Sequence, residues 1–470
     1  MNSNYILWGI IAIYMTFIFL KGVFKAKQIH NSDDYLVAGR SVRWFLLFAT
    51  MGATIIGGGY SIGAVGKTYE LGLVWVFVFA GAYFHFIFSG LVVAPQFREA
   101  KLYTVAGYFG YRFGERPRMI ALILSVLFSI FIVAAQMAAF GTVLATIMPN
   151  FAENITVLRW AIFIGGMMVV IYSTAGGLLA VMHTDIYQFV VLFIGFLITF
   201  FLCVPDIIGS WGEITTKMPA NFFQAEGGKG WLFLITTFLA FFVGETFGPA
   251  YVTRYCVATN VRETKIGIAG VGIFLGITFP VMLFFIALYA RINFPDIDPQ
   301  QALPLVVQKL NNPFIAGLII AALLSAVMSS ADSALNSATA IFVKDLFEHQ
   351  LGWGKKGDKY LLKLARICTA VLGIISMLVA ILWSDIIGIL LFTYHIWAPA
   401  IILPVVVGVI KKGKAIKYSK TIFITMIVSI CATFVFRATS WASSFDPAVF
   451  GVLISCVVFF GLNPFVKNKA

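Results

Sequence analysis

The sequence predicts an all-α membrane protein with about thirteen transmembrane helices, and three observations support this fold class. First, 60% of the 470 residues are hydrophobic and only 11% are charged, with a mean hydropathy of +0.95. This balance is typical of a polytopic membrane protein and not of a soluble domain. Second, thirteen apolar stretches are long enough to cross a bilayer. Third, basic residues concentrate in alternate connections between those stretches.

The apolar stretches define the expected helices in chain order. A helix needs about 20 mostly apolar residues to cross the hydrocarbon core. The first stretch lacks the basic region and cleavage site of a signal peptide, so we expect it to remain as a helix. The stretches cover approximately residues 4–24, 43–66, 72–97, 118–147, 157–175, 185–206, 230–253, 266–291, 313–340, 361–383, 386–410, 420–438 and 446–466.

The basic residues predict the orientation of the chain. Because cytoplasmic loops of membrane proteins are rich in lysine and arginine, the N-terminus should lie outside and the C-terminus in the cytoplasm of a cell membrane. The same pattern explains the net charge of +13 without a nucleic-acid partner. The residues concerned are Lys25, Lys27 and Arg40; Arg98, Lys101, Arg112, Arg116 and Arg118; Arg254, Arg262 and Lys265; Lys355, Lys356 and Lys359; Lys411, Lys412, Lys414 and Lys417; and Lys467 and Lys469.

Two of the stretches carry helix-breaking residues near their middle. The second contains Gly57-Gly-Gly, and each glycine costs a helix about 1 kcal/mol relative to alanine. The seventh contains Pro249 close to Gly244, Glu245 and Gly248, and a proline removes a helical hydrogen bond. Small-residue helix packing and an ordinary proline kink are the alternative interpretations. Unwound backbone at membrane depth otherwise occurs where it lines a cavity or is buried in protein.

The positions of the two breaks predict the domain organisation. Residues 43–206 and 230–410 form two five-helix sets, each opening with its broken helix, and an odd helix count inverts the second set relative to the first. Paired breaks in inverted halves are typical of alternating-access transporters with a site at the membrane midplane. Residues 1–42 then add one helix and a cytoplasmic loop, 207–229 form an external loop, and 411–470 hold two peripheral helices.

A polar stripe along the ninth stretch predicts a cation site. On a helix of 3.6 residues per turn, one face carries the residues Ala326, Ser329, Ser330, Ser333 and Ser337, with Asp332 at its border. Hydroxyl and carboxylate oxygens suit a monovalent cation, and an ionisable group at that depth is costly unless it is paired, solvated or bound to an ion. The alternative is helix packing through small residues.

Three motifs carry a resemblance to a known family. Residues 33–41, 172–188 and 329–336 resemble, in order, the first cytoplasmic loop, the strongest signature and the sodium-site helix of the sodium/solute symporter family. The resemblance covers nearly the whole chain and implies the LeuT-type fold. Members carry proline, sugars, sialic acid, pantothenate or choline, and the motifs of this chain look nearest to the choline branch.

The resemblance implies sodium as the coupling ion and assigns its ligands. The main sodium site would use the backbone carbonyls of Ala53, Ile56 and Ala326 and the hydroxyls of Ser329 and Ser330. A second sodium site, present in some members, would use Asp185, Asp332 and Ser333. Asp332 stands where the sialic acid carriers have serine, and its charge would either favour a second cation or pair with Lys344.

The resemblance leaves the substrate open. Ile55 and Gly248 stand where choline carriers have tryptophans, so the aromatic cage for choline is lacking, and Ile55 also replaces an aspartate of proline carriers. Glu245 is distinctive: it is expected to pair with a substrate amine, to carry a proton, or to hydrogen-bond the backbone freed by Pro249. Further candidates for the cavity wall, for which core packing is the alternative, are Tyr60, Gln136, Phe247, Tyr394 and His395.

The sequence therefore predicts a sodium-coupled symporter that imports a small polar organic solute, with a preference for an amino acid or another amine. A sodium/monocarboxylate or sodium/sugar symporter and a sodium-responsive sensor are the alternatives. The isolated Asp185 and Asp332 argue against a channel, and no enzyme motif or organic cofactor is expected. We expect a monomer. Arg254 fits either the inner gate that the resemblance implies or simple cytoplasmic anchoring.

Overall fold

The computed structural model is an all-helical bundle and describes residues 3–26, 41–100, 102, 104–148, 155–410 and 418–463. Within these residues, nine helices are long and apolar enough to cross a membrane, and two bent helix pairs raise the count to eleven spans. Two shorter apolar helices, α1 (Ser3–Ala26) and α19 (Pro447–Leu462), lie nearest the chain ends. Together these elements account for the thirteen predicted stretches and confirm the fold class.

The helices follow the predicted boundaries to within a few residues. α9 carries two spans, Ile155–Thr174 and Val181–Gly209. The α-helices between α1 and α19 are α3 (Trp44–Ile55), α4 (Ala64–Leu71), α5 (Leu73–Phe88), α6 (Ala94–Glu99), α7 (Val105–Phe113), α8 (Glu115–Thr146), α9 (Ile155–Gly209), α10 (Trp211–Lys217), α11 (Trp231–Glu245), α12 (Pro249–Tyr255), α13 (Val261–Asn293), α14 (Ala302–Leu310), α15 (Pro313–Ala340), α16 (Asp358–Leu382), α17 (Ile386–Ile410) and α18 (Ser419–Arg437). Single π-helical segments cover Gly59–Gly63, Ser89–Val93 and Ile341–Gln350.

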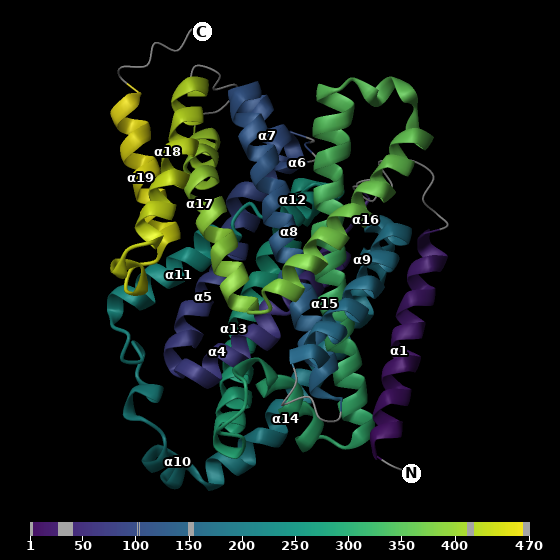
Figure 1. Cartoon of the computed structure of the whole chain (residues 1–470), viewed down its shortest axis with the longest axis vertical. Helices are drawn as coiled ribbons and strands as arrows, with labels where there is room; N and C mark the ends of the chain where they lie inside the picture. The colour runs from purple at the N-terminus through teal and green to yellow at the C-terminus, as the bar shows by residue number, and fades with distance from the viewer. Residues whose placement is uncertain are drawn as a thin grey trace.

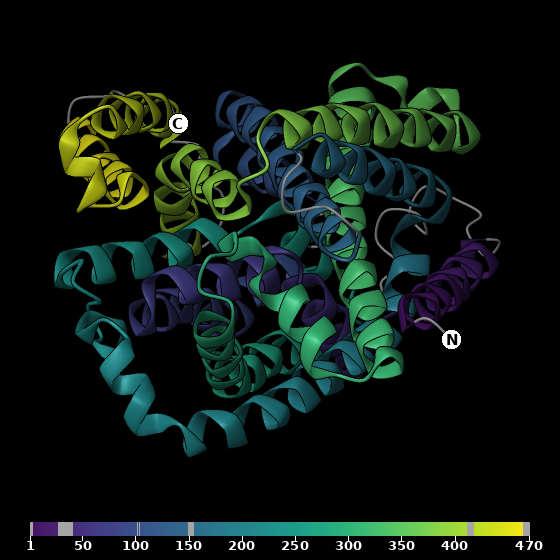
Figure 2. The same ribbon diagram turned by 60° about the horizontal axis from the view of Figure 1, so that its bottom comes forward.

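The helix α15 lies at the centre of the bundle and packs against α1, α8 and α9 (Figure 1). In its most apolar stretch 83% of the residues are buried, against 33% in α18. Its many serines and alanines allow close approach of neighbouring helices on every side, as small residues do in membrane bundles. Figures 1 and 2 both place α1 on one flank of the bundle and the pair α18–α19 on the other (Figures 1 and 2). The polar stripe therefore faces protein and not lipid.

The first broken span bends by 61° between α3 and the segment Gly59–Leu71. In a continuous helix the N–H groups of Gly57 and Gly58 would bond to the carbonyls of Ala53 and Thr54. Instead Gly57 N–H bonds to Ile55 O at 2.7 Å, and Gly58 N–H donates to the side chain of Gln136 at 2.7 Å. The break thus releases two carbonyls at the end of α3.

The second broken span bends by 54° between α11 and α12. Pro249 has no N–H to continue the helix, and Phe247 adopts a positive φ of 67°, which is uncommon for a bulky residue. The indole of Trp397 on α17 donates to the carbonyl of Thr246 at 3.3 Å, which satisfies one backbone group of the break. Both predicted helix breaks are confirmed.

The connections predicted to be cytoplasmic meet at one end of the bundle. Val42 N–H bonds to Val257 O at 3.1 Å, Arg98 donates to Thr259 O at 2.8 Å, and Arg118 pairs with Asp345 at 2.7 Å. α1 begins at the opposite end of the bundle, the end that also holds α10 and α14, whereas α19 ends on the basic side (Figure 1). The orientation in a membrane remains a prediction. Lys27, Arg40, Lys101, 411–417 and 464–470 lie outside the described residues, as does most of the motif at 33–41.

Candidate functional site

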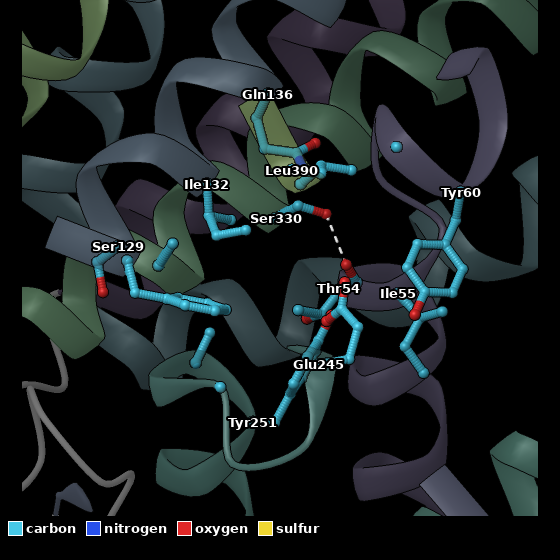
Figure 3. Close-up of a pocket in the computed structure, with 15 residues that line it drawn as sticks. Thr54, Ile55, Tyr60, Ser129, Ile132, Gln136, Glu245, Tyr251, Ser330 and Leu390 are labelled. Carbon is cyan, nitrogen blue, oxygen red and sulfur yellow. Dashed lines mark hydrogen bonds between the residues drawn. The ribbon is translucent and has the colours of Figure 1, made fainter. Parts of the chain in front are cut away.

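A small cavity lies where the two broken spans meet α8, α15 and α17 (Figure 3). Its volume is about 30 Å³. Since one water molecule needs roughly 10–15 Å³ of such space, the cavity has to widen before it can hold an organic solute. Both helix breaks contribute to its wall, through Ile55 and Gly59 on one side and Glu245 and Gly248 on the other.

Ser330 joins the central helix to the first break. Its hydroxyl donates to the carbonyl of Thr54 at 2.8 Å and to that of Ala326 at 3.1 Å, and the bond to Thr54 is drawn in Figure 3. A Cβ atom at Gly57 would lie 2.5 Å from Ser330 Oγ and 2.6 Å from Gln136 Oε1. The absence of a side chain at Gly57 therefore lets α15 and α8 approach the unwound backbone.

The residues predicted for the main sodium site share this contact between α3 and α15. Ala53 and Ile56 lie at the break of α3. The Ala53 carbonyl lacks the helical hydrogen bond that Gly57 N–H would donate to it in a continuous helix. Ser329 and Ser330 differ in their partners: the hydroxyl of Ser329 donates to Asp185 on α9. One oxygen group of the predicted set is therefore engaged with a buried carboxylate.

Asp185 is also the partner of Arg254, and both side chains are fully buried. Arg254 Nη2 lies 3.5 Å from Asp185 Oδ2 and donates to Ser333 Oγ at 2.6 Å. Arg254 Nε donates to Thr50 Oγ1 at 3.2 Å, and the Thr50 hydroxyl donates in turn to Asp185. Because Arg254 lies inside the bundle, it does not serve as a simple cytoplasmic anchor.

Asp332 takes a different partner from Asp185. Its Oδ1 accepts a hydrogen bond from Ser173 on α9, while its Oδ2 has no hydrogen-bond partner among the described residues. The side chain is 1% exposed. Lys344, the alternative partner suggested by the sequence, forms an ion pair with Glu348 at 3.1 Å. Asp185 and Ser333, two of the residues predicted for the second sodium site, are thus joined through a guanidinium, whereas Asp332 bonds to Ser173, elsewhere on α9.

Glu245 ends α11 and faces the cavity. The hydroxyl of Tyr394 donates to its Oε1. The side chain of Tyr251 interacts with the same carboxylate, and Figure 3 shows Glu245 and Tyr251 side by side in the cavity wall. Among the described residues that line the cavity, Glu245 is the one with a formal charge. The carboxylate lies between the C-terminal end of α11 and the N-terminal end of α12, whose dipoles have opposite signs at the break, so the charge of Glu245 itself sets the local potential.

The predicted substrate residues fall into two groups. Tyr60, Gln136 and Glu245 line the cavity, whereas Tyr394 contacts it only through Glu245, and Phe247 is buried in the second break. His395 lines a separate cavity with Arg437, and its Nε2 lies 3.5 Å from Asp446 Oδ1.

The lining also includes residues that the sequence analysis did not identify. Phe128, Ser129 and Ile132 fall on one face of α8 together with Gln136, at the spacing of a helical stripe. That spacing was a usable signal. Tyr251 follows Pro249 by two residues, and Leu390 lies on α17.

Comparisons with known proteins identify the family of this chain. Residues 35–416 match the model of the sodium:solute symporter family. The high-affinity choline transporter of Drosophila melanogaster is 25% identical over 81% of this chain, and the match spans 65% of that transporter. The sodium/sialic acid symporter of Proteus mirabilis is 28% identical over 81% of this chain and 78% of its own, and the high-affinity proline transporter of Bacillus subtilis is 26% identical over 81% of each.

Solved structures show the same fold. A sodium-coupled sialic acid symporter in a substrate-bound outward-open state superposes with a TM-score of 0.80 and 24% identity, over the full length of both chains. A nucleobase–cation symport family transporter in a closed conformation gives a TM-score of 0.59 and 16% identity, over 94% of this chain and 97% of its own. The helix order, the two breaks and the match over 35–416 lead to one conclusion: the chain belongs to the sodium:solute symporter family.

Proposed function

We propose that this protein is a sodium-coupled symporter that imports a small amine-bearing solute by alternating access. The observation that carries the substrate preference is the position of Glu245 in the wall of the central cavity, beside the second helix break. The family relationship and the contact between the first break and α15 support the sodium coupling.

Sodium would bind between the break of α3 and the centre of α15. The ligands would be the carbonyls of Ala53, Ile56 and Ala326 with the hydroxyls of Ser329 and Ser330. Unwound carbonyls and the C-terminal ends of half-helices are the groups that hold sodium in transporters of this architecture. In this conformation the Ser330 hydroxyl bonds to Thr54 O at 2.8 Å, so the two helices already meet where the ion would join them.

The chemistry of the cavity favours a solute with a positive charge. Glu245 places a negative charge in the cavity wall at the second break. The rings of Tyr60 and Tyr251 offer faces for a cation–π contact, and Ile55 and Leu390 offer apolar surface for the body of the solute. An amine would replace the hydrogen bonds that Tyr394 and Tyr251 give the carboxylate here.

Coupling follows from a shared element. The first break would carry sodium ligands on one side, while Ile55 and Tyr60 line the cavity on the other. Binding of either species would order this backbone, and each would raise the affinity for the other by the same factor. The inward movement of one sodium ion adds about 2.3 kcal/mol per 100 mV of membrane potential. The two five-helix sets, 43–206 and 230–410, would supply the relative movement.

A sugar is the second candidate solute. Ser129 and Gln136 bring a hydroxyl and an amide into the cavity wall, and such groups recognise sugar hydroxyls. A monocarboxylate fits less well because no residue with a positive charge lines the cavity within the described part of the chain.

A thermal-shift screen of purified protein in sodium and in potassium tests the proposal. The panel should pair primary, secondary and quaternary amines with neutral analogues of the same size, and include sugars and monocarboxylates. We expect an amine to raise the Tm in sodium, its neutral analogue to have little effect, and the shift to shrink in potassium. Sodium-driven uptake of that amine into proteoliposomes would then establish transport. Stabilisation by a sugar alone would replace the amine, and equal stabilisation in both salts would contradict sodium coupling.

A further inference from the structure

We infer that Arg254 is a built-in cation that occupies the place of a second sodium ion beside Asp185, so that the protein binds one sodium ion per transport cycle. The inference rests on the proposed sodium-coupled function and concerns its stoichiometry. It comes from the position of a guanidinium among the oxygens that would otherwise be available to a second ion.

The oxygens around Arg254 are those of a cation site. The guanidinium lies 3.5 Å from Asp185 Oδ2, 2.6 Å from Ser333 Oγ and 3.2 Å from Thr50 Oγ1. These groups come from α9, α15 and α3, three helices that would have to converge on a bound ion. The side chain of Arg254 reaches them from α12, just after the second helix break.

The charges agree with this arrangement. Arg254 and Asp185 are both 0% exposed, so their opposite charges compensate each other inside the bundle. Arginine stays protonated in proteins, and its positive charge is therefore permanent. A sodium ion added at Asp185 would meet a carboxylate that is already neutralised, and it would have to displace the guanidinium from Ser333.

The arginine also affects the main sodium site without contacting it. The Ser329 hydroxyl donates a hydrogen bond to Asp185, which leaves the lone pairs of the Ser329 oxygen for an ion on the α3 side. Arg254 holds Asp185 in place for this bond. Asp332 bonds to Ser173 and not to the Arg254 group, so an ion at Asp332 would be a separate site, and a count of bound ions detects it.

Equilibrium binding of radioactive sodium to purified protein, together with the Hill coefficient of sodium-dependent thermal stabilisation, tests the inference. Wild-type protein should bind one ion with a Hill coefficient of one. Arg254→Ala leaves Asp185 uncompensated beside an empty space, so it should bind a second, weaker ion and raise the Hill coefficient toward two.

Two control variants separate the role of charge from that of structure. Arg254→Lys keeps the positive charge and should bind one ion. The double variant Arg254→Ala with Asp185→Asn removes both charges and should also return to one ion. If the single alanine variant does not fold, the ion count of the wild-type protein and of Arg254→Lys still decides, because two ions on either would contradict the inference. Two ions on the wild-type protein, or one ion on a folded Arg254→Ala variant, would overturn the inference while leaving sodium coupling intact. If neither the wild-type protein nor any of the variants bound sodium, that result would instead overturn the proposed function, and the inference with it.

Discussion

The hydroxyl of Ser330, at the centre of α15, donates a hydrogen bond of 2.8 Å to the carbonyl of Thr54 at the end of α3 (Figure 3). This bond joins the most buried helix of the bundle to the first helix break. The Thr54 carbonyl is available for this bond because Gly58 N–H, which would bond to Thr54 O in a continuous helix, bonds to Gln136 instead. Hydrogen bonds at this contact thus link the glycine break of α3 to Gln136 on α8 and to Ser330 on α15.

Replacement of Ser330 by alanine should weaken sodium activation. Loss of one ligand from a set of about five is expected to raise the sodium concentration for half-maximal uptake by about tenfold or more, which corresponds to ~1.4 kcal/mol. The measurement is the sodium dependence of uptake into proteoliposomes at saturating solute. Ser376→Ala on α16 is a matched control, because both hydroxyls are buried and donate to the carbonyl four residues earlier. Equal sodium dependence in the two variants would rule out Ser330 as a ligand.

Replacement of Glu245 by glutamine should remove the preference for amines. Glutamine keeps the size and an acceptor oxygen for Tyr394 but loses the charge, and a hydrogen bond to a charged group contributes about 1.5–3 kcal/mol. We expect the affinity for the amine to fall by about ten- to a hundredfold, while neutral solutes are unaffected. Tyr394→Phe is the control for the structural interpretation, because it removes the hydrogen bond and keeps the carboxylate. If Glu245→Gln transports the amine normally, the carboxylate has a structural role.

The sequence was sufficient for the fold and for the two helix breaks, because both depend on local chemistry. Gly57-Gly-Gly and Pro249 disfavour a helix wherever they occur in one, and a serine every third or fourth residue marks a face of α15 without knowledge of its neighbours. The comparisons with known proteins and the bent spans agree with those predictions.

The partners of the charged residues were beyond the sequence because they depend on how distant helices are rotated. Arg254 follows an apolar stretch, as a cytoplasmic anchor would, yet it turns inward to Asp185, which lies on α9. His395 and Tyr394 are adjacent in sequence, but His395 lines a separate cavity whereas Tyr394 bonds to Glu245, because successive side chains on a helix are about 100° apart. Asp332 and Ser173 are 159 residues apart and meet only through the packing of α15 on α9.

Replacement of Gly57 by alanine should disturb the first break. The new methyl group would lie 2.5 Å from Ser330 Oγ and 2.6 Å from Gln136 Oε1, and overpacking of this kind costs about 1–3 kcal/mol. Sodium-dependent stabilisation should fall together with the Tm. The control is Gly270→Ala in α13, where the nearest atom, on Phe48, lies 3.6 Å away and the helix gains up to about 1 kcal/mol from alanine. A Gly57→Ala protein with normal sodium response would contradict the close approach at this position.

Asp185 and Asp332, the two carboxylates of the second predicted sodium site, should differ in their contribution to stability. Removing the charge of Asp185 should lower the Tm, whereas removing that of Asp332 should not. Asp185→Asn leaves the Arg254 guanidinium buried without its counter-charge, and breaking a buried ion pair in this way costs about 3–5 kcal/mol. Asp332→Asn keeps an acceptor for Ser173 and removes a charge whose second oxygen has no hydrogen-bond partner among the described residues. Its Tm should stay the same or rise.

Thermal unfolding of both variants in the same detergent gives the comparison. Adding Arg254→Ala to Asp185→Asn should restore much of the lost stability, because the uncompensated charge is then removed. Similar Tm values for the two single variants would show that Asp185 and Arg254 do not depend on each other, which would remove the basis for Arg254 as the built-in cation.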